Sequence, residues 1–284
     1  MIQSLQSLIL PGQLALQTIP LLVRTAKGSQ TTYIIVESEY DQLVYNKFIN
    51  LQKVHIFTSS MIEKNYQESC TCVEDIVYQV TQTIKHVAVL GIRDADYTPF
   101  NSSYSLPGNI FRTDARDIEM MMFECTEVKR ELKKMVVDFD DYYNKSLTIA
   151  RPIGFFRMLN DVHQLGFSFK KNLKYDQLLE SHSGDLAPGA INSFANTFFC
   201  TVINYTINDF ETFKIAHQAI NDSEICRGHD VISLLGNYLR NRITKKEIEL
   251  TLAVYYAFTS FQSTALYSQI NQWGVDRNKD LFKV

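Results

Sequence analysis

Acidic residues follow three β-prone segments of the chain, each directly after an apolar run ends. They are Glu37 after residues 32–36, Asp94 and Asp96 after residues 86–92, and Asp114, Asp117 and Glu119 after residues 109–113. Parallel strands end at one edge of a sheet, so we expect these carboxylates at the same edge. Neighbouring carboxylates raise each other's pKa values, and a divalent cation relieves their repulsion. Oxygen ligands without imidazole or thiolate suit Mg²⁺ or Mn²⁺.

Such a site would suit phosphoryl transfer or phosphodiester hydrolysis, because Mg²⁺ held by carboxylates keeps positions for water and phosphate oxygens. A structural alternative is equally well supported by the residues alone. Asp and Glu after strands are common helix N-caps. Asp114 and Asp117 have the spacing of a cap and a first-turn acid at the start of a helix. The pattern therefore leaves metal ligation and capping both open.

The elements expected to position these acids are those of an α/β protein. From residue 32 the order β-α-β-α-β-loop-β-α predicts a mostly parallel sheet flanked by helices, with right-handed crossovers. The expected strands and helices of this part lie at 32–36, 40–50, 54–57, 73–84, 86–92 and 109–113, with a loop at 60–66. A helix at 2–18 precedes them, and a β-prone run at 21–23 is expected to pair with 32–36 as a hairpin.

The sequence after residue 125 reads almost entirely as helix. Candidate helices lie at 124–137, 154–165, 191–204, 210–220 and 230–240. Apolar residues spaced by four, three, four and four positions predict one face of a single long helix over 250–265. We therefore expect two domains: an α/β domain over residues 1–124, with its N-terminal helix and hairpin, and an all-helical domain over residues 125–284.

Composition limits the classes of protein to be considered. The 284 residues carry 28 Lys and Arg against 31 Asp and Glu, a formal charge of −3, which argues against a general DNA-coating protein. No apolar run has the length of a membrane span, and the start lacks the basic segment of a secretory signal. Five cysteines without framework spacing indicate reduced thiols. We expect a cytoplasmic protein that does not bind membranes.

Two of the acidic segments resemble the Toprim fold of topoisomerases, primases and OLD-family nucleases. In that fold a Glu ends the first strand and an Asp-x-Asp ends the third; here Glu37, Asp94 and Asp96 occupy these positions. The closer resemblance is to a Toprim-like family encoded beside ABC-type ATPases, which includes the effector nuclease of the PARIS anti-phage defence system. Its motifs stand here in order at Gly91 to Tyr97, Thr113 to Met121, Ile153 to Arg157, Cys226 to Asp230 and Thr264 to Trp273.

This resemblance implies a Mg²⁺- or Mn²⁺-dependent nuclease that cleaves nucleic acid, RNA rather than DNA and transfer RNA in particular. It further implies an antiviral abortive-infection effector that is released from a partner ABC-type ATPase and acts as a homodimer. Glu37, Asp94 and Asp96 would be the metal ligands, and Glu37 would alternatively act as the general base. The residues expected to support the site are Asp41, Asp114, Asp117, Glu119, Arg227 and His229.

Other interpretations remain open at this point. Toprim proteins usually carry Gly after the first Glu, where this chain has Ser38, and Gly would let the backbone approach a metal or phosphate closely. A non-catalytic subunit that binds an ATPase or nucleic acid is one alternative, and a phosphotransferase or nucleotide-binding regulator is another. Around Gly228 we expect a turn capped by Asp230 rather than a zinc site, although Arg227 and His229 could meet phosphate. The chain has no Walker A motif, so ATP hydrolysis would belong to a partner.

Overall fold

A computed structural model of the chain describes residues 25, 30–59, 70–84, 86–101, 104–180, 185–202, 204–239 and 242–283. The helix expected at 2–18, the hairpin strand at 21–23 and the loop at 60–66 lie outside the described residues. The chain divides into two compact units. The first comprises Met1–Asp94, Ser105–Asp114 and Ala257–Val284, and the second comprises Ala95–Tyr104 and Ala115–Tyr256. Among the helices that the structure describes, none combines the length and apolar character that crossing a bilayer requires.

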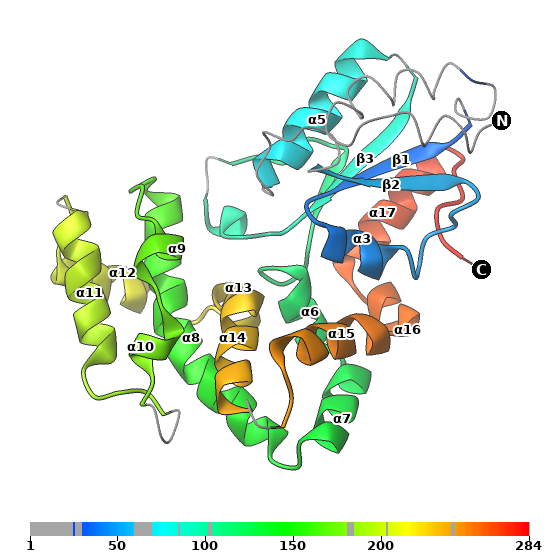
Figure 1. Cartoon of the computed structure of the whole chain (residues 1–284). Coiled ribbons are helices and arrows are strands. Elements are labelled where there is room, and N and C mark those ends of the chain that lie inside the picture. Colours follow the sequence, from blue (N-terminus) through cyan, green and yellow to red (C-terminus); the bar gives the residue numbers. More distant parts are fainter. Residues whose placement is uncertain are drawn as a thin grey trace, which may run out of the picture. The chain divides into compact units, whose positions relative to one another are not determined.

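The first unit is built on a parallel sheet (Figure 1). Within the described residues its strands are β1 (Thr32–Val36), β2 (Val54–Thr58), β3 (Ala88–Arg93) and β4 (Ile110–Arg112), in the spatial order β2-β1-β3-β4. In the register, Ile35 of β1 lies opposite Phe57 of β2 and Gly91 of β3. This confirms the prediction of an α/β protein with a mostly parallel sheet. Because β1 and β3 are neighbours, the residues that follow them share one edge.

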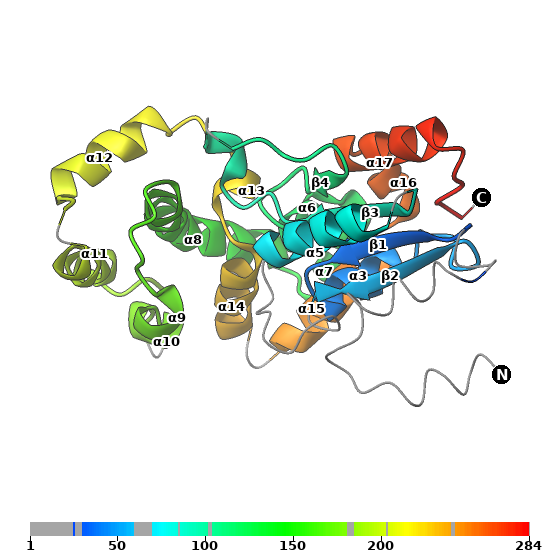
Figure 2. The same ribbon diagram turned by 90° about the horizontal axis from the view of Figure 1, so that it is seen from above.

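Helices cover both faces of this sheet (Figures 1 and 2). Helix α5 (Cys70–Thr83) packs on one face, and α3 (Glu39–Tyr45) and α17 (Ala265–Asp276) pack on the other. Alternate strand residues point to one side of a sheet, and Tyr33, Ile35 and Val89 accordingly meet the apolar side of α5. That side consists of Val73, Ile76, Val77 and Val80, all almost fully buried. This packing explains why β1 and β3 are apolar along their whole length.

The final helices of the chain belong to the sheet-containing unit. Phe261 of α16 (Phe258–Gln262) stacks on Phe48, with ring centroids 5.0 Å apart, and α17 packs against β4. The predicted domains divided the chain once, between residues 124 and 125, whereas the compact units place residues 257–284 with the sheet. The sequence pattern gives no sign of this return, since it depends on aromatic contacts between residues far apart in the chain.

The prediction of a single helix over 250–265 is wrong. The structure has α15 (Lys245–Tyr255), α16 and α17 instead, because Tyr256 and Ala257 adopt extended backbone and Thr264 begins a new helix. The Thr264 hydroxyl accepts a hydrogen bond from the backbone N–H of Tyr267, 3.0 Å away, which is the contact of an N-cap. Leu250 is also 54% exposed, so the apolar spacing that suggested a helix face does not form one buried stripe.

The second unit is helical and is organised around α8 (Phe139–Val162), which packs against α7, α12, α13 and α14. The other described helices of this unit are η1 (Thr98–Phe100), α6 (Ile118–Glu124), α7 (Thr126–Met135), α9 (Phe169–Asn172), α10 (Tyr175–Leu178), α11 (Ala190–Thr201), α12 (Ile207–Ala216), α13 (Asp222–Ile225), α14 (Gly228–Tyr238) and α15. Phe156 of α8 stacks on Phe210, with centroids 4.0 Å apart. The sequence predicted helix in most of these segments but only the last part of α8, whose interior contains Pro152.

The close packing of α5 on β3 depends on Gly91. A Cβ atom at this position would lie 2.7 Å from a methyl carbon of Val73 and 2.8 Å from one of Ile110. We predict that Gly91→Val lowers the free energy of unfolding by about 1–3 kcal/mol, measured by urea denaturation, because overpacking forces the helix away from the strand. Gly108→Val is the matched control, since no atom lies within 4 Å of its Cβ position. Equal effects of the two substitutions would contradict this packing argument.

Candidate active site

Glu37 and Asp94 come together at the carboxyl ends of the neighbouring strands β1 and β3. The Oε1 atom of Glu37 accepts a hydrogen bond from the backbone N–H of Asp94 at 2.8 Å, across 57 residues of sequence. Both residues are half-buried. The buried Arg93 forms an ion pair with Glu74, and its Nε donates to the Asp94 carbonyl oxygen at 2.9 Å. The peptide groups on both sides of the Asp94 α-carbon are therefore held.

Ser59 holds Glu37 from the other neighbouring strand. Its fully buried hydroxyl donates a hydrogen bond to the Glu37 carbonyl oxygen at 2.8 Å. Glu37 is thus fixed through its backbone by the segment after β2 and through its carboxylate by the segment after β3. Ser59 was not among the residues predicted from the sequence. The signal that would have found it is a small hydroxyl residue directly after a strand that pairs with β1.

Ser38 is compatible with this site because its backbone does not require glycine. Its φ of −131° and ψ of 166° are extended values that any residue adopts. Ser38 is the N-cap of α3, and its backbone N–H and its hydroxyl both donate to Asp41 Oδ2 at 2.9 Å. The Asp41 backbone N–H donates in return to the Ser38 hydroxyl oxygen at 3.2 Å, which makes the arrangement a capping box. Asp41, expected to support the site, fixes the start of the helix directly after Glu37.

Asp114 caps a helix that lies 151 residues further along the chain. Its Oδ2 and Oδ1 atoms accept hydrogen bonds from the backbone N–H groups of Ala265 and Leu266, at 2.6 and 2.8 Å. These are donors of the first turn of α17, which have no acceptor within the helix itself. The capping interpretation therefore describes Asp114 well, although the capped helix is not the one that follows it in sequence.

Asp117 is a structural carboxylate of the second unit. It is 2% exposed and is the N-cap of α6, where Oδ1 accepts from the Met120 backbone N–H at 3.0 Å. Its Oδ2 accepts from the Gly228 backbone N–H at 2.8 Å and lies 3.1 Å from an Arg116 nitrogen. Asp117 thus ties the start of α6 to the start of α14 and leaves its oxygens engaged in the fold.

Asp96 also belongs to the second unit and pairs with Arg116 at 3.2 Å, whereas Glu37 and Asp94 belong to the first. The Arg116 guanidinium lies over the Tyr97 ring at 4.6 Å. Burial disfavours its charge, but Tyr97, Asp96 and Asp117 together raise its pKa above the ordinary value. Arg116 therefore remains a cation that neutralises these two carboxylates, a role that was not predicted from the sequence.

His229 and Glu119 lie together at the start of α14. The His229 Nε2 atom is 3.4 Å from Glu119 Oε1; Glu119 is buried, and about half of the His229 side chain is exposed. Partial burial of the imidazole lowers its pKa, and the neighbouring Arg227 guanidinium lowers it further. Glycine at position 228 allows the start of α14 to lie close to Glu119. A Cβ atom there would be 2.4 Å from the Cβ of Glu119.

Asp230 does not cap the turn at Gly228, so that expectation is wrong. Its carboxylate instead accepts two hydrogen bonds from Arg157 of α8, at 2.8 and 3.0 Å. Arg227 occupies the N-cap position without a side-chain capping bond. Cys226 is fully buried, and burial raises the pKa of its thiol, which disfavours the thiolate that zinc requires.

The donor chemistry at Glu37 and Asp94 fits Mg²⁺. No group of three or more His, Cys, Asp or Glu side chains in the described part of the chain is arranged to hold a metal. Mg²⁺, however, is usually bound by one or two carboxylates together with waters and phosphate oxygens. The Glu37 carboxylate lies against the backbone of Asp94 here, and Asp94 carries a second carboxylate. No model of a protein family matches the chain, and no curated protein matches it.

Asp114 and Asp117 provide a direct test of the capping roles. We predict that Asp117→Ala lowers the free energy of unfolding by about 3–5 kcal/mol, because it leaves Arg116 without a buried carboxylate partner. Asp114→Ala should lower it by about 1 kcal/mol, the usual effect of losing a cap. Urea denaturation measures both values. If Asp117→Ala were as mild as Asp114→Ala, the role of Asp117 as a buried structural anion would be contradicted.

Proposed function

We propose that the chain is a Toprim-like, Mg²⁺-dependent nuclease that hydrolyses phosphodiester bonds. The observation that carries the proposal is the contact between Glu37 and Asp94 at the carboxyl ends of β1 and β3. Open parallel sheets bind their ligands at this edge. The parallel pairing of the described strands, the Glu directly after β1 and the Asp directly after its neighbour β3 support the comparison with Toprim proteins.

In this proposal Glu37 and Asp94 hold the metal. Bound there, Mg²⁺ would activate a water molecule and offset the charge that develops on the phosphate oxygens. The hydrogen bonds from Ser59 and from the Asp94 backbone hold Glu37 in place before substrate arrives, which limits the reorganisation that the reaction requires. The capping box of Ser38 and Asp41 fixes the helix that begins beside Glu37.

The proposed substrate and biological setting rest on the resemblance of the sequence motifs to those of the Toprim-like family encoded beside ABC-type ATPases. We propose RNA, and transfer RNA in particular, as the substrate, with release from a partner ABC-type ATPase and homodimerisation as the steps that activate the nuclease in anti-phage defence. Two of the motifs are in direct contact in the second unit, where the Asp117 carboxylate accepts a hydrogen bond from the Gly228 backbone N–H. This contact supports the proposal that the two motifs, although far apart in the sequence, act together in the folded protein.

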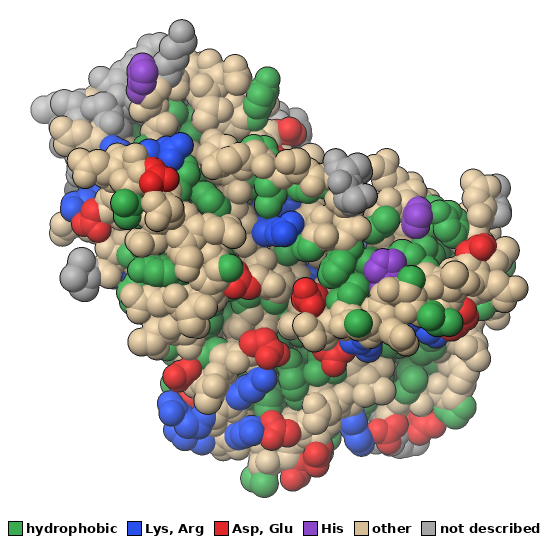
Figure 3. Space-filling view, turned by 180° about the vertical axis from the view of Figure 1, so that it is seen from behind, with side chains coloured by type: hydrophobic (Ala, Val, Ile, Leu, Met, Phe, Trp, Pro, Cys, Tyr) green, Lys and Arg blue, Asp and Glu red, His purple; other side chains and the backbone are tan. Residues whose placement is uncertain are grey.

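A non-catalytic subunit that binds an ATPase or nucleic acid is the second candidate. It is favoured by the pairing of Asp96, the third expected ligand, with Arg116 in the second unit. The basic residues of α7 do not decide between the candidates. Lys133 pairs with Asp140 and Lys134 pairs with Glu131, and Figure 3 shows Lys and Arg intermixed with Asp and Glu over this helix. Such a surface is not the continuous cationic track that a phosphate backbone favours.

Cleavage of nucleic acid tests the nuclease proposal. We predict that the purified chain, separated from any ATPase partner, cuts total transfer RNA in Mg²⁺ or Mn²⁺ but not in EDTA. Glu37→Ala and Asp94→Ala should each reduce the rate at least about 100-fold, because each removes a carboxylate from the metal site. Asp114→Ala is the matched control and should retain cleavage, since this carboxylate caps α17.

Other RNA and single- and double-stranded DNA define the substrate class in the same assay. Cutting that persists in both the Glu37 and the Asp94 variants would contradict the assigned site. Metal binding without cutting of any substrate, before or after release from the ATPase, would favour the non-catalytic subunit.

Metal binding has a test that does not depend on activity. A ligand that binds only the folded protein raises the melting temperature by mass action. We predict that Mg²⁺ raises the melting temperature of the native chain and of Asp114→Ala, and that Glu37→Ala and Asp94→Ala lose this increase. If Mg²⁺ still raised the melting temperature of Glu37→Ala, or no longer raised that of Asp114→Ala, the metal would bind at a site other than Glu37 and Asp94.

A further inference from the structure

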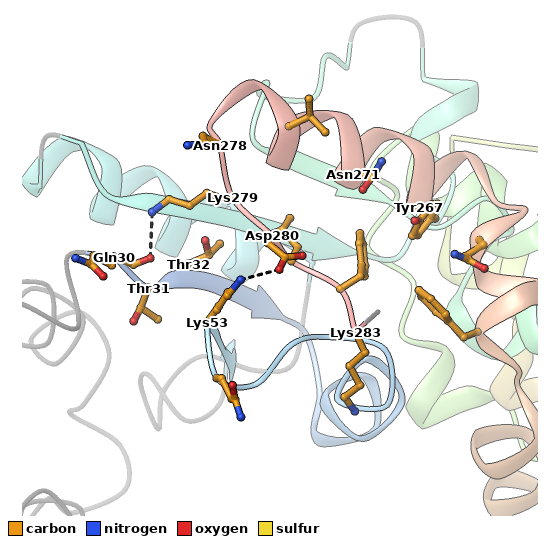
Figure 4. Close-up of a pocket in the computed structure, with 16 residues that line it drawn as sticks. Gln30, Thr31, Thr32, Lys53, Tyr267, Asn271, Asn278, Lys279, Asp280 and Lys283 are labelled. Atoms are coloured by element: carbon orange, nitrogen blue, oxygen red, sulfur yellow. Dashed lines mark hydrogen bonds and ion pairs between the residues drawn. The ribbon is translucent and has the colours of Figure 1, made fainter.

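The first unit contains a cleft at the edge of the sheet opposite the carboxyl ends of the strands. It has a volume of about 1080 Å³. One wall is formed by residues 30–32 at the start of β1 and by Lys53 directly before β2. The other wall is formed by α16, α17 and residues 278–283 (Figure 4). We call it the amino-edge groove, and it shares no residue with the proposed nuclease site.

The charge of the amino-edge groove is positive. The charged residues among the described ones that line it are Lys53, Lys279, Asp280 and Lys283. Lys53 forms an ion pair with Asp280 at 2.7 Å. Lys279 instead donates to the backbone carbonyl of Gln30 at 3.0 Å, and Lys283 donates to the carbonyls of residues 46 and 47 at 2.8 Å each. Carbonyl groups orient the ammonium groups without cancelling their charge, so the groove favours an anion.

The remainder of the groove offers amides and aromatic rings. Asn271 and Gln262 carry side-chain amides, which donate and accept hydrogen bonds together. Phe258 and Tyr267 contribute rings whose centroids lie 6.0 Å apart, edge to face. Figure 4 shows Asn271 and Tyr267 extending from α17 on one side of the Lys53–Asp280 pair, with Lys279 on the other side. The polar and aromatic groups therefore line the same groove as the lysines.

We propose that the amino-edge groove binds a nucleoside phosphate. Lys279 and Lys283 would contact the phosphate groups, since lysine binds phosphate as a compact charge. The amides of Asn271 and Gln262 match the donors and acceptors on base edges, and Tyr267 and Phe258 supply surfaces on which a base can stack. The volume suits a ligand of this size. Binding at this groove does not depend on the proposed nuclease activity, because it uses neither Glu37 nor Asp94.

Isothermal titration of the full chain in EDTA tests the proposal, because EDTA removes any contribution of a metal at Glu37 and Asp94. The probes are adenosine diphosphate and uridine diphosphate, compared with adenosine, uridine and inorganic phosphate. At least one diphosphate should bind, and the double variant Lys279→Ala with Lys283→Ala should weaken its binding by about tenfold or more. Lys170→Ala with Lys171→Ala is the matched control, since both lysines are exposed in the second unit and outside the groove.

A further variant and a further control separate binding in the groove from binding elsewhere on the chain. Asn271→Asp places a negative charge on an exposed position of α17 and should also weaken binding, without removing a lysine. Glu37→Ala should bind as the native chain does, even if the nuclease proposal fails. The proposal is overturned if neither diphosphate binds, if binding survives the double lysine variant, or if inorganic phosphate alone or a nucleoside alone binds as tightly as the diphosphate.

Discussion

The parallel pairing of β1 with β3 is the constraint on which the candidate site depends. It places Glu37 and Asp94 side by side although 57 residues separate them, so that the carboxylate of one receives the backbone N–H of the other. The pairing is secured by apolar residues on both strands and by the closeness of α5 to Gly91. A carboxylate held in this way keeps its position without a cation, which is the preorganisation that a metal site on a rigid scaffold requires.

The acidic residues divide into those that build the fold and those of the proposed metal site. Asp41, Asp114 and Asp117 satisfy backbone N–H groups at the starts of α3, α17 and α6, which would otherwise lack partners. Arg116 neutralises Asp96 and Asp117 inside the second unit. Glu37 and Asp94 differ because they lie at neighbouring strand ends, where parallel sheets bind ligands. The amino-edge groove lies at the opposite ends of the strands and, through Lys279 and Lys283, favours an anion instead of a cation.

Sequence reasoning predicted the features that local patterns encode. The continuous apolar runs predicted β1 and β3, and the acids directly after them predicted where Glu37 and Asp94 would meet. It did not predict partners that the topology brings together, such as Asp114 with the start of α17 or Asp230 with Arg157, because hydropathy patterns carry no information on distant pairing. It joined α15, α16 and α17 into one helix for a related reason: an apolar period can continue across a break made by extended backbone and a Thr cap.

The most direct test of the central claim is the position of a bound metal. Crystals of the chain soaked in Mn²⁺ would reveal the ion through its anomalous scattering, independently of any catalytic activity. We predict a peak in contact with carboxylate oxygens of both Glu37 and Asp94, which is absent from crystals of Glu37→Ala. A peak at Asp114, Asp96 or Asp117, with none at the carboxyl ends of β1 and β3, would contradict this assignment.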